Sequence, residues 1–95
     1  MAKLKTTRFD AAEYLESEKD IAEFIEAAFE SGDTAHIARA LGVVARARGM
    51  MQLAKDTGLT REALYRMLSE DGNPTLDTLL KVSKAFGLQL TVHPA

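Results

Sequence analysis

Side chains that could hydrogen-bond to DNA are concentrated between residues 60 and 66 of this 95-residue chain. Arginine can pair through two hydrogen bonds with guanine or hold a phosphate, glutamate can accept from cytosine, and tyrosine can reach a phosphate or a thymine methyl group. The side chains concerned are Thr60, Arg61, Glu62, Tyr65 and Arg66. Their chemistry favours recognition of base edges and phosphates over catalysis.

Two short helices joined by a glycine turn would position these side chains. The first is expected over residues 50–57 and ends at Gly58, because glycine readily adopts the positive φ of a helix terminus. Thr60 then caps a second helix, and the small Ala54 lies where two such helices cross at close range. The inner stripe of the second helix is Leu64, Met67 and Leu68. The polar side chains of that helix then project outward.

This stretch resembles the helix-turn-helix of the phage-repressor class, the Xre family. The resemblance continues through residues 71–82, where a Gly-Asn-Pro loop precedes an amphipathic segment capped by Thr75. It implies a lambda-repressor-like fold in which the second helix of the motif enters the major groove of DNA. The chain departs from the class at Met50, where these repressors usually have a glutamine that contacts a phosphate.

More narrowly, the chain is similar to the addiction-module antidote proteins of bacterial toxin–antitoxin pairs, the HigA-like antitoxins of type II systems. The similarity covers most of residues 9–92, and it is carried by Phe-Asp-x-x-Glu-Tyr-Leu at 9–15, by residues 61–66 and by residues 72–76. It implies a homodimer that binds a double-stranded DNA operator, represses its own operon and neutralises a co-encoded RelE/ParE-type toxin.

Length and composition are those of one small soluble domain, with 46% hydrophobic and 27% charged residues. The absence of cysteine excludes a disulfide framework, a thiol nucleophile and the usual cysteine-containing zinc sites. The chain has no apolar run of membrane-spanning length and no signal-peptide pattern at its start, so we expect a cytoplasmic location.

The net charge of −2 is distributed unevenly along the chain. Residues 1–34 contain four bases and nine acids, whereas residues 35–95 contain eight bases and five acids. A local basic surface is sufficient for phosphate contact, so the acidic first third is expected to face solvent or a basic partner. Arg46 and Arg48 are expected either to contact phosphate or to offset a helix dipole, and Gln52 and Asn73 to fix the register on the DNA backbone.

The fold class predicted is all-α, with an N-terminal helical extension and a short C-terminal β-strand. The extension covers residues 1–33 and the helix-turn-helix domain residues 34–95, within one compact unit. A capping box predicts a short helix over 11–15, and Ser17 caps the next helix, which has the apolar stripe Ile21, Phe24, Ile25, Ala28 and Phe29. Further helices are expected over 34–47, with inner residues Ile37, Ala38, Leu41, Val44 and Ala45, and over 75–86, ended by Gly87.

The segment 88–92 alternates apolar and polar residues and predicts a strand, with Leu88, Leu90 and Val92 on one face. A strand needs a partner, because unpaired backbone groups are costly. Three partners remain open: the extended stretch 4–8, the same strand of a second chain across a two-fold axis, or another protein such as the toxin.

Catalysis has little support in the sequence. His36 and His93 are far apart and have no metal-ligand spacing around them, and no glycine-rich phosphate loop is present. We expect no enzyme activity, no metal and no cofactor. Two alternative functions remain: a stand-alone phage-type regulator without a toxin, and a protein-interaction module that uses the helix pair and the terminal strand without binding DNA.

Overall fold

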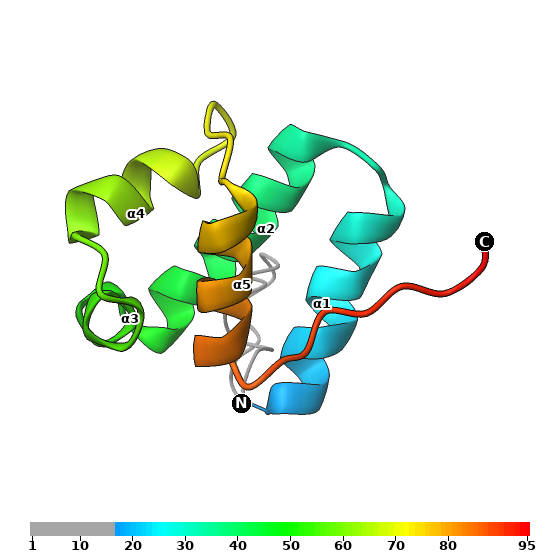
Figure 1. The fold of residues 1–95 in the computed structure, drawn as a ribbon, viewed down its shortest axis with the longest axis horizontal. Helices are drawn as coiled ribbons and strands as arrows, with labels where there is room; N and C mark the ends of the chain where they lie inside the picture. The colour runs from blue at the N-terminus through cyan, green and yellow to red at the C-terminus, as the bar shows by residue number, and fades with distance from the viewer. Residues whose placement is uncertain (1–16) are drawn as a thin grey trace, which may run out of the picture.

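The computed structural model describes residues 17–95, and this part of the chain folds into five helices. Figure 1 shows α2 and α5 in the middle of the molecule, α1 on one side of them, and α3 and α4 on the other. The helices are α1 Glu18–Glu30, α2 Thr34–Arg48, α3 Met50–Thr57, α4 Arg61–Met67 and α5 Leu76–Ala85. The helix predicted over residues 11–15 lies outside the described residues.

Side-chain caps begin four of these helices, because an N-cap oxygen satisfies one of the free N–H groups of the first turn. The predicted caps are confirmed: Ser17 accepts from the N–H of Asp20 at 3.1 Å, Thr60 from that of Ala63 at 3.1 Å, and Thr75 from that of Thr78 at 3.1 Å. For α2, which begins at Thr34 as predicted, the cap is Asp33. Helix α3 differs, since it follows Gly49 directly and has no side-chain cap.

One hydrophobic core joins α1 to the four helices that follow it. Most of the buried side chains of α1 and α2 are those of the predicted stripes, but Ala40, which was not predicted, is buried as well. Phe24, Phe29 and Ile37 of the stripes are only partly buried at the edge of the core. Phe86, at the end of α5, is the largest of the fully buried side chains. The buried apolar residues include Ile21, Ile25, Ala28, Leu41, Val44, Leu53, Leu64, Leu68 and Val82. Helix α4 is therefore fixed to the body of the protein from its inner side.

Helix α2 passes very close to the end of α4 at Gly42. A methyl group built on Gly42 would clash with the carbonyl oxygen of Leu68, which is a backbone atom and cannot rotate away. Glycine is therefore required here by close approach, although its own φ is ordinary. This contact sets how near the C-terminal end of α4 lies to α2.

Gly42→Ala should lower the free energy of unfolding by about 1–3 kcal/mol, the usual cost of overpacking. The sign is informative, because alanine in a helix interior is otherwise favoured over glycine by about 1 kcal/mol. Urea denaturation followed by circular dichroism measures the change. A variant as stable as the parent, or more stable, would show that the two helices are free to move apart.

The predicted C-terminal strand is wrong for the residues that the structure describes. Residues 88–92 form no ladder, because no second extended segment of residues 17–95 lies alongside them. Gly87, with φ of 81°, ends α5, and the tail then runs past α1 (Figure 1). The apolar and polar residues of the tail still differ in burial at first: Leu88 and Leu90 are half-buried, while Gln89 and Thr91 are exposed. Val92, however, is 97% exposed. The stretch 4–8, one of its possible partners, lies outside the described residues.

Candidate nucleic-acid interface

The three residues 58–60 connect α3 to α4 and turn the chain sharply. Figure 1 shows α3 almost end-on while α4 runs across the view, so the two helices cross steeply. Gly58 ends α3 with φ of 77°, and its N–H donates to the carbonyl of Ala54 at 2.9 Å. Ala54, where the sequence predicted the close crossing, is partly buried against the core.

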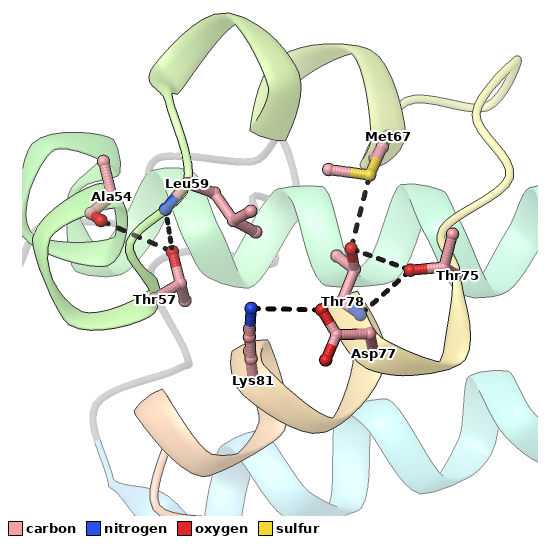
Figure 2. A network of polar contacts seen from close by, with 8 residues as sticks. All are labelled: Ala54, Thr57, Leu59, Met67, Thr75, Asp77, Thr78 and Lys81. Carbon is pink, nitrogen blue, oxygen red and sulfur yellow. Dashed lines mark hydrogen bonds and ion pairs between the residues drawn. The ribbon is translucent and has the colours of Figure 1, made fainter.

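Thr57 fixes this turn from inside. Its hydroxyl donates to the carbonyl of Leu53 at 2.8 Å and accepts from the N–H of Leu59 at 3.3 Å. Figure 2 shows the bond to Leu59 together with a longer one, of 3.5 Å, from the same hydroxyl to the carbonyl of Ala54. The side chain is buried, so both bonds are shielded from water and hold the first residues after α3 in place. No local pattern predicts this role, because threonine at the end of a helix also occurs as an ordinary surface residue.

A second polar link ties α4 to α5. The hydroxyl of Thr78 donates to the sulfur of Met67 at 3.4 Å and accepts from the hydroxyl of Thr75 at 3.1 Å (Figure 2). On the inner side of α4, Leu64 is fully buried and Leu68 nearly so. Packing and hydrogen bonds thus fix the inner face of a seven-residue helix that would be unstable alone.

The outer face of α4 is open to solvent. Arg61, Glu62 and Arg66 are exposed, and Tyr65 is 50% exposed, so the structure brings these four predicted residues together on one short helix. None of these four side chains takes part in an ion pair within residues 17–95. Thr60 is also exposed, but its hydroxyl is engaged by the N–H of Ala63.

The remaining predicted residues are more scattered. Gln52 lies on the exposed side of α3, where its amide donates to Asp56 at 2.9 Å. Arg48 is exposed at the C-terminal end of α2, and Asn73 is exposed in the loop before α5. The guanidinium of Arg46 lies 3.3 Å from where a methyl on Gly42 would be, so its side chain folds back along α2 toward the end of α4.

Met50, the position at which the sequence departs from the repressor pattern, lies inside the protein. Its side chain is only 8% exposed and belongs to the hydrophobic core. A polar side chain at this position would have to leave the core to reach a phosphate. The neighbouring Met51 is instead 70% exposed.

Opposite charges occupy opposite sides of the molecule. Residues 46–66 carry five bases and two acids, all exposed, and include α3 and α4. Residues 17–33, which include α1, carry six acids and one base, also all exposed. Because α1 and the α3–α4 pair lie on either side of α2 and α5 (Figure 1), the acidic helix faces away from the basic region.

Sequence reasoning also missed an exposed ion pair between Arg39 on α2 and Glu70 after α4. The two side chains approach to 3.3 Å with 49% and 66% of their surfaces exposed, so the pair contributes little stability in water. It lies at the same end of α4 as Gly42. A pairing of residues so far apart in sequence leaves no local pattern to read.

Groups of metal-binding side chains and membrane-spanning helices are both absent from the described region. Among residues 17–95, no group of three histidine or acidic side chains is placed to hold a metal ion. No helix in this region is long and apolar enough to cross a membrane.

The fold and this surface define a small all-helical protein, at least over residues 17–95, that presents a short polar helix on a basic side. The chain belongs to the probable addiction module antidote protein family, whose model matches residues 5–94. An uncharacterized protein of Haemophilus influenzae is 46% identical over 85 residues, which cover 90% of this chain and 88% of the relative. No solved structure matches the chain.

Proposed function

We propose that the protein is a sequence-specific DNA-binding antitoxin of the Xre, HigA-like type. It represses its own operon and neutralises a co-encoded toxin of the RelE/ParE type. The observation that carries the DNA-binding part is the open polar face of α4. This helix is held by α3, a glycine turn and a buried core, and these features support its assignment as the second helix of a helix-turn-helix.

In this proposal α4 enters the major groove. Arg61 and Arg66 pair with guanine or hold phosphates, Glu62 accepts from cytosine, and Tyr65 reaches a phosphate or a thymine methyl. Gln52, on the neighbouring helix, contacts the DNA backbone. Thr60 acts chiefly through its cap, which orients the first turn of α4 and leaves the backbone N–H of Arg61 near the groove.

The supporting residues have a more limited role. Arg48 and Asn73 are exposed near the ends of α2 and α5 and are free to contact phosphates beside the groove. Arg46 is also exposed, and its side chain lies over Gly42 on α2, where it adds to the basic surface and is free to contact a phosphate. Positive charge from all these residues contributes to affinity without specifying a sequence.

Titration of labelled DNA tests this function. A fragment from immediately upstream of the protein's own gene and a scrambled fragment of equal length are titrated with the full chain at several salt concentrations. We expect tighter binding to the native fragment, with a logarithmic salt slope of about 0.9 for each phosphate contacted. Equal affinity for the two fragments, or no binding, would favour the interaction module that does not bind DNA.

The acidic α1 supports a basic toxin as the second partner. Glu23, Glu26 and Glu30 are exposed on this helix, on the side of the molecule away from the proposed DNA surface. A protein that itself binds RNA carries basic surface, and complementary charge speeds association of the two proteins. The extended tail beside α1 offers unpaired backbone groups to the same partner.

The combined variant Glu23→Lys, Glu26→Lys and Glu30→Lys should reduce protection of cells that express the adjacent toxin gene, because it reverses the charge of the proposed contact. Removal of residues 1–16 should weaken protection in the same way. Operator binding by both variants should persist, which separates loss of toxin binding from misfolding.

A control for the position of the charge reversal is Asp71→Lys, which reverses a single exposed acid away from α1, in the loop after α4. It should leave protection unchanged. Full protection by both the α1 variant and the truncated chain would place the neutralising surface on the helix-turn-helix or on the tail. If the adjacent gene encodes no toxin, the stand-alone regulator becomes the better reading.

A further inference from the structure

Two leucines on α5 face solvent, although the opposite side of this helix already contributes buried side chains to the hydrophobic core. Leu76 is 68% exposed and Leu80 is 51% exposed, one helical turn apart on the same face. The inward face of α5 is complete without them, since Val82 and Phe86 are fully buried. Isolated exposed leucines are common, whereas two on one helical face form a small apolar patch that is suited to contact with a partner.

The charges beside these leucines run in a definite order along the helix. Asp77 lies at the N-terminal end, while Lys81 and Lys84 follow toward the C-terminal end, and all three are exposed. Asp77 and Lys81 pair within the chain at 3.1 Å (Figure 2). Such an order is self-complementary: when two copies of the helix lie antiparallel with Leu76 beside Leu80, Asp77 of each copy comes near Lys81 of the other.

We infer that the exposed face of α5 is the interface between two copies of this chain. About a two-fold axis at the level of residue 78, in the first half of the helix, Leu76 of one copy packs beside Leu80 of the other. The two leucine pairs are flanked by Asp77 and Lys81 from both copies. Figure 1 shows α5 on the near side of the molecule, with no other described helix in front of it.

A second copy fits this face better than the toxin does. A basic partner would meet Lys81 and Lys84 here, whereas α1 offers it acidic residues on another side. The inference rests on the proposed function to the extent that one helix-turn-helix unit reads only half of a two-fold operator, so two copies are needed. It also replaces the tail as the interface within the dimer, which leaves the tail free for the toxin.

Sedimentation equilibrium of the purified full-length protein without DNA tests the interface. The parent should dimerise in the micromolar range, and the double variant Leu76→Gln, Leu80→Gln should raise the dimer dissociation constant at least about tenfold. Val92→Gln, which alters an even more exposed apolar residue, should change nothing. A monomeric parent, or a double variant that dimerises like the parent, would overturn the inference.

A charge exchange keeps the test independent of leucine packing. Asp77→Lys alone should weaken dimerisation, because it places like charges across the axis, and the double variant Asp77→Lys, Lys81→Asp should restore it. The chain lacking residues 88–95 is measured alongside these variants. If that deletion causes the dimer to dissociate while the leucine and charge variants do not, the tail forms the interface. No DNA is present in these measurements, so they do not depend on whether the protein binds an operator. A protein that dimerises but does not bind the operator would contradict only the proposed function.

Discussion

Phe86→Ala should lower the free energy of unfolding by about 3–5 kcal/mol, the range measured when a large buried aromatic side chain is truncated. Phe86 is 1% exposed at the end of α5, where the core formed with α1 and α2 closes. A protein of this size has a total stability of about 5–15 kcal/mol, so the variant should melt far below the parent. Thermal and urea denaturation followed by circular dichroism measure the loss.

Two further variants separate cavity formation from other causes. Phe86→Leu keeps most of the volume and should cost less than the alanine substitution. Tyr65→Ala removes a comparable ring from a position that is 50% exposed, and should change stability by less than about 1 kcal/mol. Equal losses from Phe86→Ala and Tyr65→Ala would mean that α5 does not close the core as the structure has it.

The double variant Arg61→Ala, Arg66→Ala should weaken binding to the native operator by about 2–6 kcal/mol, since each arginine that pairs with a base contributes about 1–3 kcal/mol. Both side chains lie on the exposed face of α4, so the melting temperature should remain close to that of the parent. Binding curves at one fixed salt concentration, with native and scrambled DNA, measure the effect.

The control for loss of charge is Lys19→Ala, which removes one of the two units of positive charge that the double variant loses, but from α1 on the opposite side of the molecule. It should alter operator affinity only slightly, because screening reduces interactions beyond about 8–10 Å at ordinary salt. If the arginine variant binds the operator as tightly as the parent, α4 has been assigned the wrong role. If Lys19→Ala weakens binding as strongly, affinity depends on total charge and not on α4.

The helices of the described region were predictable because their signals are local. Ser17, Thr60 and Thr75 cap their helices as the sequence indicated, and Gly58 and Gly87 end theirs with positive φ. A cap and a stripe depend on residues within a few positions of each other. For the same reason, the outward face of α4 followed directly from its inner stripe.

Tertiary relations left no comparable signal. The closeness of Gly42 to Leu68 and the pairing of Arg39 with Glu70 depend on how helices cross, which local spacing does not encode. Leu76 looked like a core residue by type, and only the packed fold shows it exposed. The strand failed for a related reason: its alternation is real, but a strand exists only with a partner, and residues 17–95 supply none.

The most direct test of the central claim, that the exposed face of α4 contacts DNA, is to follow the backbone amide signals of the full chain by NMR as operator DNA is added. The DNA is the fragment from upstream of the protein's own gene, with the scrambled fragment as reference. We expect the largest specific shifts in residues 60–66, smaller ones around Gln52, and almost none along α1. Shifts confined to α1 or to the tail, or identical shifts with both fragments, would contradict it.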